Sequence, residues 1–150
     1  MKKLFLLLLL VSKVHAYENV QLKHSPEFVF QSVLKIMAIE KDSHISFPTI
    51  VLEKETNLKE FQKDVEPQWG MKPDFITNVF VAALNKIYLL DEKRYYEENG
   101  RCIDDSLAHE LVHFVQVKYR NIPIEYFDDS MEMEAIDVQS RFRDLYCRLE

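Results

Sequence analysis

The sequence predicts an α+β domain in which a small, mostly antiparallel sheet packs against three to four helices. The chain has 150 residues, enough for one domain with one hydrophobic core. Apolar, β-branched runs occupy its middle, whereas longer segments with helical apolar spacing lie before and after them. No repeat, low-complexity segment or linker interrupts the sequence, so we expect these elements to share one core.

Local signals mark the first helix and the first strand. Ser25 is a favoured N-cap residue and is followed by Pro26, which suits the first position of a helix. The apolar spacing that follows predicts a helix over residues 26–41. Residues 44–53 are apolar and β-branched, which predicts a strand with Pro48 near its start or at a sheet edge.

The middle of the chain is predicted to hold a short helix and a hairpin. Residues 57–64 favour a short helix, and two apolar runs follow at 78–84 and 87–90. We expect these runs to be strands joined by a tight turn at residues 85–86, although Asn-Lys is a weaker turn signal than Asn-Gly. The charged residues 91–100 are predicted to form a loop.

Two longer helices are predicted in the C-terminal part. Ile103 leads into the first, which is expected to have Asp104 or Asp105 as its N-cap. It should end near Tyr119, because a proline follows shortly afterwards. The last helix is expected over residues 129–148, where apolar residues recur along one face.

The first of these two helices carries the sequence His109-Glu110-Leu111-Val112-His113. Residues four apart lie on the same face of a helix, so the two imidazoles can point at one metal ion. Zinc suits two neutral imidazoles plus a carboxylate, with an open position for water. Glu110 projects beside the metal, where it can take a proton from a water whose pKa the ion has lowered. The alternative is an amphipathic helix with two satisfied histidines and a solvated glutamate.

A site of this kind needs a third protein ligand, and Glu132 and Glu134 on the last predicted helix are both candidates. They flank the apolar stripe at comparable angles, so helical spacing does not choose between them. Each also has a structural interpretation. Glu132 could complete a capping box begun by Asp129, and Glu134 could be a solvated acid that the helix dipole favours.

The order of these residues resembles the gluzincin metallopeptidases. In that clan H-E-x-x-H is followed by a helix with the pattern E-x-x-A, which Glu132 and Ala135 match here. The resemblance therefore implies Glu132 as the zinc ligand, with Glu134 in reserve. Residues 87–139 are also similar to small, uncharacterised, secreted bacterial zincin-like proteins. The resemblance implies a zincin-like fold, Zn²⁺ as the cofactor and a peptide or protein as the substrate.

The chain departs from the gluzincin pattern at Ile136, because many gluzincins have there an aspartate that orients a ligand histidine. Asp137, Gln139, Asp105 or a backbone carbonyl could serve instead, and the sequence leaves this open. In zincins the strand before the histidine helix is the sheet edge that holds an extended substrate. By resemblance, residues 87–90 should line the cleft.

The first 16 residues have the organisation of a secretory signal peptide. A basic start leads into a short apolar run and then into Val14-His15-Ala16, a small-residue cleavage site. The run is too short to span a bilayer as a helix of the mature protein. We expect cleavage near Ala16, a metallopeptidase domain over residues 17–150, and an exported protein that is periplasmic or secreted.

Charge and hydropathy disfavour two kinds of partner. The net charge of −6 leaves no basic stripe for DNA or RNA. After the signal sequence, no stretch is long and apolar enough to predict a membrane span.

Two cysteines, Cys102 and Cys147, are present. An even number in an exported protein predicts a disulfide, which would connect the start of the histidine helix with the last helix. Closing a loop of this size is worth about 4 kcal/mol in the chain-entropy model. The alternative is a pair of buried free thiols.

Three functions follow from these observations. The first is a zinc metallopeptidase with His109, His113 and Glu132 as ligands and Glu110 as the general base. The second is a zincin-like module that binds metal or protein with little or no turnover. The third is a disulfide-linked helical adaptor without metal.

Overall fold

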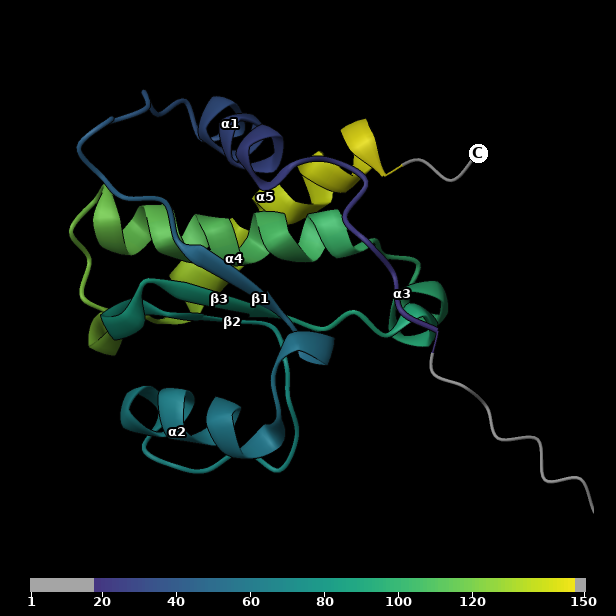
Figure 1. Ribbon diagram of the computed structural model, residues 1–150. Helices are drawn as coiled ribbons and strands as arrows, with labels where there is room; N and C mark the ends of the chain where they lie inside the picture. The colour runs from purple at the N-terminus through teal and green to yellow at the C-terminus, as the bar shows by residue number, and fades with distance from the viewer. Residues whose placement is uncertain (1–17, 148–150) are drawn as a thin grey trace, which may run out of the picture.

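The computed structural model describes residues 18–147, and Figure 1 shows its layers. Helices α1 and α5 lie on one side of α4, the sheet lies on its other side, and α2 covers the far face of the sheet. The helices of the described part are α1 (Pro26–Ile36), α2 (Leu58–Trp69), α3 (Lys93–Asn99), α4 (Ile103–Lys118) and α5 (Asp129–Tyr146). The strands of that part are β1 (Thr49–Leu52), β2 (Val79–Val81) and β3 (Lys86–Leu89). The α+β class is confirmed, with five helices in the described part rather than three or four.

The sheet is mixed rather than mostly antiparallel. Its order is β1-β3-β2, with β1 parallel to β3 and β2 antiparallel to β3. Ile87 on β3 therefore lies between Ile50 on one side and Phe80 on the other. The expectation that residues 87–90 form the sheet edge beside the histidine helix is wrong, because β3 is the central strand and β2 is an edge.

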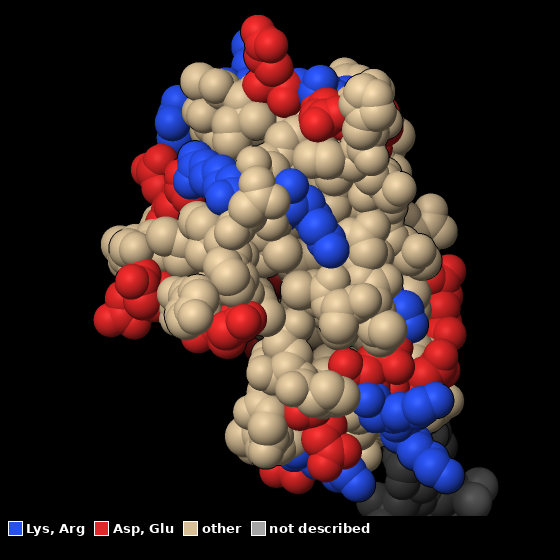
Figure 2. All heavy atoms as spheres, turned by 90° about the vertical axis from the view of Figure 1, so that its left-hand side faces the viewer, with Lys and Arg blue, Asp and Glu red and all other residues tan. Residues whose placement is uncertain are grey.

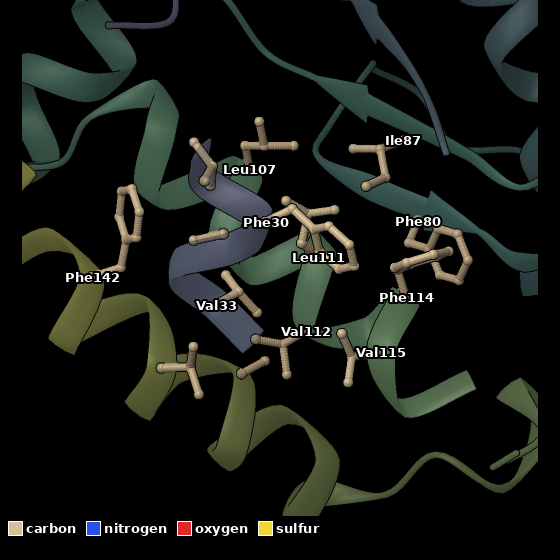
Figure 3. Close-up of a cluster of buried hydrophobic side chains, with 14 of the residues drawn as sticks. Phe30, Val33, Phe80, Ile87, Leu107, Leu111, Val112, Phe114, Val115 and Phe142 are labelled. Atoms are coloured by element: carbon tan, nitrogen blue, oxygen red, sulfur yellow. The ribbon is translucent and has the colours of Figure 1, made fainter. Parts of the chain in front are cut away.

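Helix α4 is the centre of the main core, because the sheet covers one side of it and α1 and α5 cover the other. Figure 3 shows the side chains of these elements meeting in one cluster. The labelled members are Phe30 and Val33 of α1, Phe80 of β2, Ile87 of β3, Leu107, Leu111, Val112, Phe114 and Val115 of α4, and Phe142 of α5. This packing buries most of α4 and fixes the helix that carries His109 and His113.

A second, smaller core joins α2 to the other face of the sheet. Successive side chains of a strand point to opposite faces, so Val79 and Val81 face away from Phe80 and towards α2. They pack with Phe61 and Val65 of α2. This contact places the C-terminal end of α2 beside the edge strand β2.

The start of α4 is fixed by a capping box. Cys102, not Asp104 or Asp105 as expected, is the N-cap. The backbone N–H of Asp105 donates to Cys102 Sγ at 3.3 Å, and Asp105 Oδ2 accepts from the N–H of Cys102 at 3.0 Å. Asp104 instead accepts the backbone N–H groups of Lys23 and His24, which fastens the N-terminal segment to α4.

Helix α1 ends earlier than predicted. Ala38 has a φ of 54°, in the left-handed region, and the N–H of Ile39 bonds the carbonyl of Leu34 at 2.9 Å. This is the Schellman arrangement that closes many helices. The residue at the left-handed position is usually glycine, so the alanine here gave no stop signal in the sequence.

The strands are shorter than predicted. β1 begins after Pro48 rather than at residue 44, and β2 ends at Val81. A 3-10 turn over Ala82–Leu84 and Asn85, with a φ of 47°, leads from β2 into β3. The expected antiparallel hairpin is present, but its connection is longer than a two-residue turn.

Helix α2 is longer than the predicted 57–64. Asn57 caps its start, accepting from the N–H of Glu60. The helix continues through Pro67 to Trp69, and its C-cap is Gly70, whose φ of 70° suits glycine.

The predicted loop over residues 91–100 is wrong, because most of it forms α3. Tyr96 anchors this helix: its side chain is buried and its hydroxyl donates to the carbonyl of Leu90 at 2.6 Å. Gly100 ends the helix in the left-handed conformation. One aromatic anchor among charged residues gives no helical stripe, which explains why the sequence did not predict it.

The disulfide between Cys102 and Cys147 is confirmed, with their Cα atoms 6.1 Å apart. It joins the N-cap of α4 to the C-cap of α5. No helix in the described part of the chain combines the length and the apolarity that a membrane crossing requires. The expected signal peptide over residues 1–16 lies outside the described residues.

Candidate metal centre

Helix α4 brings the two histidines of the motif together one turn apart. Their Nε2 atoms are 3.1 Å apart, and the rings lie nearly perpendicular with centroids 4.8 Å apart. His113 is buried and His109 is partly exposed. The packing of α4 on both sides leaves this motif facing a cleft between β2 and the start of α5.

Helix α5 adds Glu132 to the two imidazoles. Its carboxylate oxygens lie 3.2 Å from Nε2 of His113 and 3.4 Å from Nε2 of His109. The reserve candidate Glu134 lies elsewhere: it pairs with Arg120 at 2.7 Å and accepts from Gln116 at 3.0 Å. The structure thus places Glu132, and not Glu134, against both histidines.

The spacing of these atoms fits a tetrahedral zinc site. Zinc–nitrogen and zinc–oxygen bonds of about 2.0–2.1 Å separate tetrahedral ligand atoms by about 3.3 Å. The two imidazole Nε2 atoms are 3.1 Å apart, and each lies near a different oxygen of the Glu132 carboxylate, at 3.2 Å for His113 and 3.4 Å for His109. The donor set of two imidazoles and one carboxylate is also a known zinc-binding set that keeps a position open.

A second group of possible ligands among the described residues is Cys102, Asp105 and Cys147. Its two cysteines are joined in the disulfide, and Asp105 contacts Arg101 and Arg143. A disulfide sulfur is not a thiolate ligand, and the arginines oppose a cation there.

Gln139 orients His109. Its Oε1 lies 3.2 Å from Nδ1 of His109, and its Nε2 donates to Asp105 Oδ1 at 2.8 Å. Asp105 in turn pairs with Arg101 and Arg143. Because the amide nitrogen of Gln139 is directed at a carboxylate, its oxygen faces the ring and accepts from Nδ1–H. Nε2 of His109 is then the nitrogen with a free lone pair.

Gln116 orients His113 in the same way from α4 itself. Its Oε1 lies 2.9 Å from Nδ1 of His113. Its Nε2 donates to Glu134 Oε2 and to the carbonyl of Met131, both at 3.0 Å. Glu134 is the acid at the end of this second chain of contacts and is neutralised by Arg120. Both Nε2 lone pairs are therefore directed towards the point that Glu132 also faces.

The sequence left open which group orients a ligand histidine. The structure shows Gln139 in contact with His109 and Asp105 in contact with Gln139. Asp137 does not take part, because it is exposed and pairs with Arg141. Gln116 was not predicted to orient either histidine. Its one available signal was its spacing, three residues after His113 on the same helix.

The protonation of the site follows from burial and from charges close by. Burial, reinforced by His113, lowers the pKa of His109 to about 4, so this ring is neutral at pH 7. Burial also favours the neutral form of His113, but the carboxylates of Glu132 and Glu110 outweigh it and raise its pKa above 6.5. Burial raises the pKa of Glu110 to about 7.

A cleft of about 450 Å³ opens in front of these groups. Besides the candidate ligands and Glu110, it is lined by Gln68, Trp69, Asn78, Val79, Phe80, Ile124 and Phe127. The first five belong to the end of α2 and to β2 with its approach, and the last two to the segment before α5. Figure 2 faces the end of the molecule where α2 and α4 finish and shows a hollow surrounded mainly by uncharged side chains.

No family model, curated protein or solved structure matches this chain.

Proposed function

We propose that the protein is a zinc metallopeptidase. The observation that carries the proposal is the convergence of the imidazoles of His109 and His113 and the carboxylate of Glu132, whose nearest nitrogen and oxygen atoms are 3.1 to 3.4 Å apart. These separations match the edges of a tetrahedral zinc site, and the glutamine contacts leave the required nitrogen lone pairs free. When bound, Zn²⁺ supplies a Lewis acid that lowers the pKa of water towards neutrality.

Glu110 is the proposed general base. It follows the first histidine on α4, lies in the same cleft and is 5% exposed. Because burial raises its pKa to about 7, the carboxyl gains and loses a proton near neutral pH. In the proposed reaction it accepts the proton of the attacking water and gives it to the leaving amine.

A peptide is the proposed substrate because of what forms the walls of the cleft. One wall is the edge strand β2, beside which the backbone of a short peptide can lie. The half-buried apolar side chains of Ile124 and Phe127, on the segment before α5, can contact apolar substrate side chains.

A second candidate function is a metal-binding module with little turnover. Both imidazoles contact a neutral glutamine amide rather than a carboxylate, at 3.2 Å for His109 and 2.9 Å for His113. A neutral partner raises the basicity of a ligand histidine less than a carboxylate does. This observation favours metal binding without strong catalysis.

Comparison of the wild type with Glu110→Gln separates the two candidates. Both proteins are loaded with zinc and assayed on a broad peptide library, with Glu40→Gln, a change at an exposed residue, as the matched control. A peptidase loses cleavage in Glu110→Gln while it keeps its zinc, and Glu40→Gln behaves as the wild type. Equal behaviour of all three proteins, with zinc bound, would assign the protein to the non-catalytic class.

We further propose that the protein is exported and cleaved near Ala16. The disulfide between Cys102 and Cys147 is compatible with this, because disulfides persist in oxidising compartments. N-terminal sequencing of the protein from its native source should begin at Tyr17. A sequence that begins at Met1 would contradict cleavage.

A further inference from the structure

The outer edge of β2 forms part of the wall of the cleft in front of His109 and His113. The side chain of Gln68 covers part of this edge. β2 pairs with β3 on one side only. The carbonyl of Phe80 and the N–H of Ala82 are directed away from β3, towards the end of α2. Backbone groups of this kind at a sheet edge are the ones that an added strand would bond.

The amide of Gln68 bonds both of these groups. Its Nε2 donates to the carbonyl of Phe80 at 2.9 Å, and its Oε1 accepts from the N–H of Ala82 at 2.9 Å. One amide thereby provides the donor and the acceptor that the backbone of an added strand would provide. Both contacts have the length of good hydrogen bonds.

The position of Gln68 is set by the packing of α2. Phe61 and Val65, which are fully buried, attach the helix to the sheet, and Gly70 ends it directly afterwards. Gln68 lies one turn beyond Val65 and lines the same cleft as His109 and His113. The covered part of the strand edge is therefore next to the proposed zinc site.

The remaining outer group of Phe80 is its N–H, which faces the carboxylate of Glu110 and opposes the rise in the pKa of that group. With Gln68 in place, little of the short strand Val79–Val81 is open to a second chain. An extended polypeptide that paired along the whole of β2 would have to displace Gln68.

We propose that Gln68 is a specificity-determining residue that restricts the site to short peptides and chain ends. The proposal rests on the proposed function, because it concerns the substrate of the same site. Gln68 occupies the edge of β2 from the carbonyl of Phe80 onwards, so a longer extended substrate gains no further backbone pairing there. Removing the amide opens this part of the edge and favours longer substrates.

The test uses Gln68→Met, which keeps the length of the side chain and its apolar contacts but loses both hydrogen bonds. The matched control is Gln62→Met on the same helix, whose amide donates to the carbonyl of Pro73 at 2.8 Å, away from β2. Binding is measured on zinc-loaded proteins that also carry Glu110→Gln, so that peptides are not cleaved. The probes are a series of apolar peptides from two to eight residues long.

In the wild-type background, affinity should stop rising with length after the first few residues. Gln68→Met should bind the longest peptides at least about fivefold more tightly, the value of one typical hydrogen bond, and the dipeptide unchanged. Gln62→Met should keep the wild-type dependence on length. The proposal would be overturned if affinity depended on peptide length in the same way in all three proteins. It would also be overturned if none of the three bound any peptide.

Amide hydrogen exchange of Ala82 gives a second readout that needs neither zinc nor substrate. Its N–H should exchange at least about fivefold faster in Gln68→Met than in the wild type or in Gln62→Met, because its acceptor is gone. An unchanged exchange rate of the Ala82 N–H would show that Gln68 does not protect the edge of β2. Failure of the proposed function would appear differently, as a wild-type protein that binds no zinc, and would leave this exchange result intact.

Discussion

The side-chain oxygen of Gln116 lies 2.9 Å from Nδ1 of His113, one turn away on the same helix. The contact turns the other nitrogen of the ring towards His109 and Glu132. Gln139 makes the corresponding contact with His109 from α5, and each glutamine is held by a carboxylate behind it. The ligand geometry of the proposed zinc site therefore depends on two neutral amides.

Replacing either glutamine should weaken zinc binding. In Gln116→Met or Gln139→Met the Nδ1–H of the histidine loses its acceptor, so the tautomer and the ring orientation are no longer fixed. Partners of this kind typically contribute about 10- to 100-fold to metal affinity. Zinc titration against a competing chelator measures the change.

Gln31→Met is the matched control for these two variants. Gln31 is exposed on α1 and bonds only Glu27 among the contacts that the structure shows. It should leave the zinc affinity unchanged. Equal affinities in all three variants would remove the orienting role of Gln116 and Gln139.

Glu110 should make the metal-free protein less stable as the pH rises. Burial raises its folded-state pKa to about 7 from the model-compound value of 4.5, so between these values the folded protein binds the proton more tightly than the unfolded chain. Stability from this group is present at low pH and is lost as the pH rises through about 7. A shift of this size corresponds to roughly 3 kcal/mol.

Glu110→Gln removes this titration. The difference in unfolding free energy between Glu110→Gln and the wild type, from urea denaturation with a chelator present, should increase in favour of the variant from pH 4.5 to pH 7.5. Taking the difference cancels much of the effect of His109, whose lowered pKa acts in the opposite direction. A constant difference would show that Glu110 has an ordinary pKa.

Phe114 should be among the most costly residues to truncate. It is fully buried between the sheet and α1, in edge contact with Phe30 and Phe80. Phe114→Ala should lower the unfolding free energy by about 3–5 kcal/mol, because it leaves a cavity in the main core. Phe75→Ala, at a residue that is 71% exposed, should cost far less in the same urea denaturation. Similar costs would contradict the described core.

The disulfide should contribute strongly to stability. It closes a loop with a sequence separation of 45, which is worth about 4 kcal/mol in the chain-entropy model. The double variant Cys102→Ser and Cys147→Ser should lose about this amount in urea denaturation without reductant. If dithiothreitol lowers the stability of the variant as much as that of the wild type, the effect does not come from this bond.

The sequence predicted the histidine helix and the meeting of its two imidazoles because these signals are local. His109 and His113 are four apart on an apolar helix, and their meeting follows from helical geometry alone. Helical spacing did not choose between Glu132 and Glu134, which needed the packing of α5 on α4. The resemblance to gluzincins favoured Glu132, the residue that the structure places beside the imidazoles.

The parts that the sequence did not predict depend on contacts between distant segments. The parallel pairing of β1 with β3 joins residues far apart in the chain, so no local sequence pattern predicts it. Gln68 is one of several glutamines, and its contacts with Phe80 and Ala82 arise only when α2 packs on the sheet. Amides carry no charge or periodicity that would mark such a residue.

Zinc titration of the wild type beside Glu132→Ala and Glu134→Ala tests the central claim most directly. We predict one zinc ion per wild-type chain, a loss of at least about 100-fold in affinity for Glu132→Ala, and a retained, weaker site in Glu134→Ala, which loses only a group behind Gln116. A wild-type protein that binds no zinc, or a site that survives Glu132→Ala and disappears in Glu134→Ala, would contradict the account.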